Sequence, residues 1–146
     1  MVMPFRLSRV FLYWLLLFVI LYVISFFLFG MYMSTNNLLA AIGQQLAAPI
    51  VYFIFGWLYY RKANIEHWHW RLAVIPIWLL LSIGMSAILI KPIYGYDWTA
   101  AINLAVFEGQ LLNVAALVVA AYVGSPSKGK GVEGSERLDG LEGPKF

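Results

Sequence analysis

The chain has 146 residues, of which 62% are apolar, 12% are charged and none is cysteine. A soluble domain is about 45–50% apolar and about 25% charged, so this composition excludes a disordered chain and a soluble globule, which could not bury so much apolar surface. The absence of cysteine excludes disulfides and thiol-based metal sites, and the mean hydropathy of +0.79 predicts an integral membrane protein.

Four long apolar stretches predict four transmembrane helices, at about residues 10–33, 38–60, 72–90 and 98–123. At about 1.5 Å per residue, such stretches match a hydrocarbon core of about 30 Å. The polar turn at 34–37 is expected to end the first helix and to cap the second. Pro49 lies inside the second stretch, where a membrane helix kinks rather than stops.

The end of the chain differs in composition from the rest. Residues 124–146 contain six glycines, two prolines, four basic residues and four acidic residues, which predicts a disordered tail. We therefore expect two parts: a membrane domain at 1–123, folded as an all-α bundle of four transmembrane helices, and a disordered cytoplasmic tail at 124–146.

The basic residues predict the orientation of the bundle. With four spans, the N-terminus, the middle loop and the tail share one side, and nine of the ten Lys and Arg residues fall there. The other side carries only Lys91. Because cytoplasmic loops are enriched in Lys and Arg, both termini are predicted to be cytoplasmic, in a multi-pass protein of the cell membrane. The net charge of +3 is then explained by topology and anionic headgroups, without nucleic acid as a partner.

Glu108 is the one ionisable side chain deep within a predicted span. Counted along 98–123, it lies roughly 4 Å to the outer side of the midplane. A charge there costs from about 2.5 to over 10 kcal/mol, and no Lys, Arg or His of the same chain lies at that depth. An intramembrane acid of this kind is a candidate for proton or cation binding, or for interhelical hydrogen bonding as a neutral carboxyl.

The surroundings of Glu108 predict a contact with another helix. Ala101, Ala105 and Gly109 form a series of small residues spaced by four, a pattern that lets membrane helices approach closely. Gln44 and Gln45 of the second span lie at nearly the same depth as Glu108. We therefore predict that one of these glutamines hydrogen-bonds the carboxyl group of Glu108.

Further polar residues lie on the other side of the fourth span. On a helical wheel, Asn103 and Gln110 fall opposite Glu108, with Asn113 near them. A helix that is polar on two sides cannot face lipid on either without cost. This predicts contact with the chain's own bundle, a second copy or another membrane protein.

The remaining motifs give little support to an enzyme or a metalloprotein. The pair His67 and His69 beside Glu66 is a weak candidate for metal binding, and interfacial anchoring explains the alternating His and Trp residues there more simply. Phosphate-binding loops, nucleophile elbows and zinc-protease motifs are all absent from the sequence. We expect no catalytic residues, cofactor or metal.

Three functions are compatible with these residues. The first is an accessory or structural membrane subunit that packs through its fourth helix. The second is a small proton- or cation-coupled transporter based on Glu108, and the third, weaker, is an interfacial enzyme based on His67 and His69. The partners expected are the lipid bilayer and either a second copy or another membrane protein.

Overall fold

The structure is a computed structural model that describes residues 6–124, and its secondary structure in that range is entirely helical. The elements are α1 (Leu7–Thr35), α2 (Leu38–Ala63), α3 (Trp68–Tyr94), the short 3₁₀ helix η1 (Trp98–Ala101) and α4 (Leu104–Val123). Four helices are long and apolar enough to cross a membrane. The expected all-α fold with four membrane-spanning helices is thus confirmed.

The first three helices end on residues in the left-handed backbone conformation. These residues are Asn36 (φ 49°), Asn64 (φ 47°) and Gly95 (φ 71°). Asparagine and glycine tolerate this conformation better than other residues, which makes them common helix terminators. The side chain of Asn37 then accepts a hydrogen bond from the Leu39 N–H at 2.9 Å and caps α2, as expected for the turn at 34–37.

The fourth helix begins later than expected, so the prediction of one continuous helix over 98–123 is wrong. The Asn103 side chain accepts a hydrogen bond from the Val106 N–H at 2.9 Å, and α4 begins at the next residue. Asparagine competes for backbone donors in this way and favours the cap over the helix interior. The other three helices extend beyond the predicted spans by up to four residues at each end. Apart from Gly124, the predicted tail lies outside the described residues.

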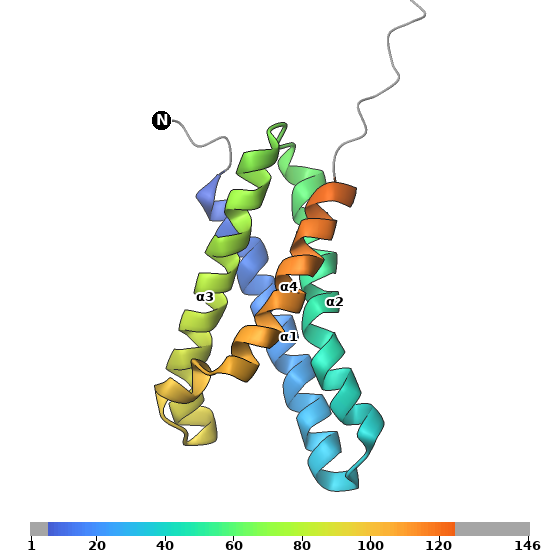
Figure 1. Cartoon of the computed structure of the whole chain (residues 1–146), viewed down its shortest axis with the longest axis vertical. Helices are drawn as coiled ribbons and strands as arrows, with labels where there is room; N and C mark the ends of the chain where they lie inside the picture. The colour runs from blue at the N-terminus through green and yellow to red at the C-terminus, as the bar shows by residue number, and fades with distance from the viewer. Residues whose placement is uncertain (1–5, 125–146) are drawn as a thin grey trace, which may run out of the picture.

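The four helices run alternately up and down (Figure 1). The start of α1, the α2–α3 connection and the end of α4 lie at one end of the bundle. We call this the basic end, because the described residues there include Arg6, Arg9, Arg61, Lys62 and Arg71. Away from it, α3 diverges from the α1–α2 pair (Figure 1).

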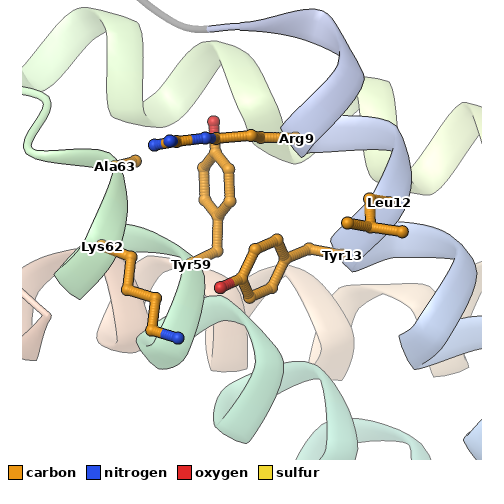
Figure 2. A pocket seen from close by; sticks show the side chains of 6 residues that line it. All are labelled: Arg9, Leu12, Tyr13, Tyr59, Lys62 and Ala63. Atoms are coloured by element: carbon orange, nitrogen blue, oxygen red, sulfur yellow. The ribbon is translucent and has the colours of Figure 1, made fainter.

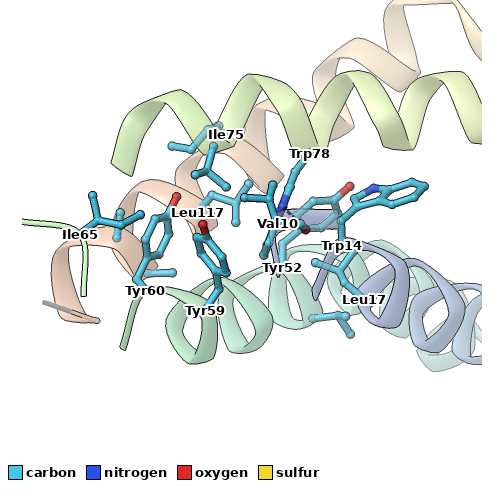
Figure 3. Packing of buried hydrophobic residues seen from close by; sticks show 14 residues of the cluster. Val10, Trp14, Leu17, Tyr52, Tyr59, Tyr60, Ile65, Ile75, Trp78 and Leu117 are labelled. Carbon is cyan, nitrogen blue, oxygen red and sulfur yellow. Dashed lines mark hydrogen bonds between the residues drawn. The ribbon is translucent and has the colours of Figure 1, made fainter. Parts of the chain in front are cut away.

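Buried side chains concentrate in the half of the bundle nearest the basic end (Figure 3). The large ones come from all four helices and from the α2–α3 connection: Val10, Trp14, Leu17, Tyr52, Tyr59, Tyr60, Ile65, Val74, Trp78 and Leu117. Many large apolar side chains farther along remain exposed, such as Phe27 at 67% and Ile88 at 70%. Lipid tails solvate such side chains as well as a protein core does, so this exposure suits a membrane bundle.

Three helices are joined by hydrogen bonds inside this core. The Oγ atom of Ser82 on α3 accepts bonds from Trp14 Nε1 of α1 at 2.9 Å and from the Tyr52 hydroxyl of α2 at 2.6 Å. Trp78 Nε1 of α3 also donates to the Val10 carbonyl of α1 at 3.1 Å. These bonds satisfy buried donors where no water would be present.

Arg71 joins the helices at the basic end, although its side chain is only 4% exposed. Its Nε donates to the Ile65 carbonyl at 2.7 Å and its Nη1 to the Ala121 carbonyl at 3.1 Å. Its own carbonyl accepts the Tyr60 hydroxyl at 2.9 Å. A guanidinium near the end of α4 also interacts favourably with the helix dipole there. Arg71 thus connects the α2–α3 connection and α3 with the end of α4.

Candidate functional site

The intramembrane polar residues border a cavity of about 490 Å³ between α2 and α4. Its lining comes from α2 (Gln45, Ala48 and Pro49) and from α4 (Val106, Glu108, Gly109, Gln110, Leu112 and Asn113). We call it the Glu108 cavity. Four of the six residues predicted to form a polar site therefore meet here: Gln45, Glu108, Gln110 and Asn113.

The predicted hydrogen bond between a glutamine of α2 and Glu108 is not formed among residues 6–124. Gln45 lines the same cavity as Glu108, but both side chains are exposed and unbonded to one another. Gln44 is half-buried and does not line the cavity. Successive residues on a helix point about 100° apart, so only one of two neighbouring glutamines can face α4.

Two amides of α4 border the same cavity as Glu108 and are bonded to each other. Asn113 is 4% exposed, and its Nδ2 donates to Gln110 Oε1 at 3.0 Å. Its Oδ1 is buried and has no hydrogen-bond partner among the described residues. Gln110 and Asn113 point in other directions from α4 than Glu108 does, and all three nevertheless border one cavity.

Pro49 removes one main-chain hydrogen bond from the part of α2 that lines the cavity. Pro49 has no N–H, so it cannot donate the intrahelical bond that the Gln45 carbonyl would otherwise accept. Side-chain oxygens of Gln45, Glu108, Gln110 and Asn113 lie around the same space. Such oxygens can coordinate a hard cation, or they can accept hydrogen bonds from polar side chains of a neighbouring helix.

Two residues assigned to the fourth helix lie before it begins. Asn103 is the cap of α4, and its Nδ2 donates to the Ala100 carbonyl at 3.0 Å. Ala101 belongs to η1, so the series Ala101, Ala105, Gly109 does not continue along one helix. A Cβ atom at Gly109 would meet no described atom within 4 Å. This series therefore makes no close helix contact within the described chain at Gly109.

The close approach of α2 and α4 occurs instead at Gly56, which the sequence reasoning missed. A Cβ atom there would lie 2.9 Å from Leu117 Cδ2 and 3.0 Å from the Ala120 Cβ. Ser82 and Arg71 were also missed as structural centres. Ser82 is a polar residue in an apolar span, and Arg71 is a cation at the start of that span. These features suggest a structural role, but they do not identify the residues to which Ser82 and Arg71 are hydrogen-bonded.

His67 and His69 lie on the surface at the start of α3. Their rings stack at 5.5 Å between centroids, with an angle of 17° between the planes. Within residues 6–124, no group of three or more His, Cys, Asp or Glu side chains is placed to hold a metal ion. This pair supplies two ligands at most.

Comparisons with protein-family models, curated proteins and solved structures found no match to this chain. The Glu108 cavity is therefore interpreted from its own chemistry.

Proposed function

We propose that this chain is an accessory or structural subunit of a membrane assembly and that the surface of α4 around the Glu108 cavity is its contact surface. The supporting observation is that Glu108 is exposed on a helix that crosses the membrane. An ionised carboxyl group facing lipid costs at least about 2.5 kcal/mol. Protein that covers this surface removes that cost.

A second copy of the chain suits this surface. The cavity rim carries hydrogen-bond acceptors in the Glu108 carboxyl group and both donors and acceptors in the Gln45 and Gln110 amides. In a twofold-symmetric dimer each patch meets an identical patch, so it must be self-complementary. Gly109 beside it leaves room for a helix to approach.

Cysteine cross-linking tests this proposal, and the absence of native cysteine makes it direct. Leu112 lines the cavity and is 55% exposed, whereas Leu80 is 70% exposed on α3. In native membranes, Leu112→Cys should form a covalent dimer on oxidation and Leu80→Cys should not. The additional substitution Gly109→Leu should abolish the cross-link because it fills the approach. Equal cross-linking at both positions, or none at either, would contradict the proposal.

Proton- or cation-coupled transport is the second candidate, and the cavity itself favours it. The space is about 490 Å³, and a helix carrying Pro49 meets a helix carrying a carboxyl group there. Broken or kinked helices at mid-membrane depth commonly line the ion sites of transporters. In this case Glu108 takes up and releases the proton.

Flux measurements separate the two candidates. The Glu108→Gln variant keeps the shape and hydrogen bonding of the side chain but cannot titrate. In liposomes under a proton gradient, a carrier loses flux in this variant and keeps it in the matched variant Glu66→Gln, which lies outside the spans. A wild-type protein without flux, whose Leu112→Cys variant still cross-links, supports the subunit and rules out the carrier.

The orientation of the assembly follows from the basic end. We infer that this end faces the cytoplasm at the cell membrane, because Lys and Arg are retained on that side. Both chain termini then lie in the cytoplasm.

A further inference from the structure

A second cavity, of about 430 Å³, lies between α1 and α2 at the basic end (Figure 2). Arg9, Leu12 and Tyr13 line it from α1, and Tyr59, Lys62 and Ala63 line it from α2. We call it the Arg9 cavity. It shares no lining residue with the Glu108 cavity, which lies between α2 and α4.

The two charged side chains that line the Arg9 cavity are both positive. Arg9 and Lys62 carry positive charge and can only donate hydrogen bonds. Within residues 6–124, no carboxylate lines the cavity and neither cation forms an ion pair. Among these residues Glu66 is the one acid near the basic end, and it lies outside the lining.

Tyr59 provides an independent indication of a missing acceptor. Its side chain is 1% exposed, and its hydroxyl has no hydrogen-bond partner among the described residues. The Arg9 side chain crosses the hydroxyl end of this ring in Figure 2 and lies within electrostatic range of it. Because Arg9 offers no acceptor, the hydroxyl proton of Tyr59 remains unpaired. An anionic oxygen beside both groups would accept a bond from each.

The apolar surface next to the cavity favours a lipid as the source of that anion. Leu12 lines the cavity and is 52% exposed. Leu16 (47% exposed) and Val19 (51% exposed) continue from it at helical spacing along the same face of α1. An acyl chain can follow this row while its headgroup stays at the basic end. A soluble phosphate has no apolar part that could contact these side chains.

We propose that the Arg9 cavity binds the phosphate group of an anionic phospholipid, through the Arg9 guanidinium, the Lys62 ammonium and the Tyr59 hydroxyl. Two cations facing one phosphate diester favour a lipid with net negative charge. A zwitterionic headgroup would bring its own ammonium to a site where the described lining supplies two cations and no carboxylate. This site is independent of the proposed contact surface on α4.

Native mass spectrometry of the full chain in detergent tests the site, with phosphatidylglycerol and phosphatidylcholine of the same acyl chains as probes. Lys62→Gln should weaken phosphatidylglycerol binding by about tenfold. Arg61→Gln removes the same charge from the neighbouring residue, which does not line the cavity, and should change binding by less than about twofold. Tyr59→Phe keeps the ring and the net charge and should weaken binding by at least about fivefold.

Three results would overturn the proposal. The first is equal weakening by Lys62→Gln and Arg61→Gln, which would mean general attraction to the basic end. The second is unchanged binding in Tyr59→Phe. The third is displacement of the lipid by glycerophosphate or inorganic phosphate, which would mean that a soluble phosphate occupies the cavity. Preference for phosphatidylglycerol over phosphatidylcholine, lost in Lys62→Gln and Tyr59→Phe alone, would support it.

Discussion

Ser82 receives two hydrogen bonds at one oxygen atom, each from a different helix. The donors are the Trp14 indole and the Tyr52 hydroxyl, and all three residues are buried. In the hydrocarbon region neither donor could turn to water if the serine oxygen were removed. The cost of losing the oxygen is therefore the cost of two unpaired groups, and not of one ordinary hydrogen bond.

Replacing Ser82 by alanine should lower the free energy of unfolding by about 1–3 kcal/mol. Unfolding in mixed detergent–dodecyl sulfate micelles, followed by circular dichroism, measures this change. Ser86→Ala is the matched control, because Ser86 lies one turn later on α3 and is exposed. Equal losses in both variants would show that the two bonds to Ser82 contribute nothing specific.

The contact between α2 and α4 is closest at Gly56. Gly56 of α2 lies against Leu117 and Ala120 of α4, and there is no space at Gly56 for an added Cβ atom. The neighbouring aromatic residues Tyr59 and Tyr60 fill the same core at a ring separation of 5.4 Å. Close-packed interiors of this kind respond to added volume by shifting whole elements.

The Gly56→Ala substitution should therefore destabilise the bundle, by about 1–3 kcal/mol. Gly84→Ala provides the comparison, because a Cβ atom there meets no described atom within 4 Å. Alanine at that position should leave stability unchanged or raise it by up to about 1 kcal/mol. Thermal unfolding of both variants in one detergent measures the difference. A Gly56→Ala protein as stable as Gly84→Ala would mean that α2 and α4 do not pack as described.

At the scale of the whole molecule, the bundle has a basic end that should determine its direction in the membrane. Single cysteines can report this direction because the native chain contains none. A membrane-impermeant maleimide should label Ser34→Cys in intact cells and Glu66→Cys only after permeabilisation. The reverse pattern would contradict a cytoplasmic basic end.

The spans were predictable because the bilayer demands long apolar runs, and these runs are continuous in the sequence. The start of α4 could not be predicted in this way, because Asn103 and Leu104 lie inside an apolar run. The helix begins there because the Asn103 side chain accepts a hydrogen bond from the Val106 N–H. Gln45 and Glu108 were predicted at a similar depth, and they do share a cavity. Which of Gln44 and Gln45 faces α4 depends on helix rotation, which apolar periodicity cannot specify in helices that are apolar on all sides.

The bonds of Arg71 have a consequence for the order in which the protein is assembled. The bonds from Trp14 and Tyr52 to Ser82 need only the first three helices. The bond from Arg71 to the Ala121 carbonyl spans 50 residues and needs the last turn of α4. During synthesis, the bonds to Ser82 can therefore form before α4 is complete, whereas the bond from Arg71 to Ala121 cannot. The Arg71 side chain therefore gains its bond to α4 only after the last residues of the membrane domain have been made.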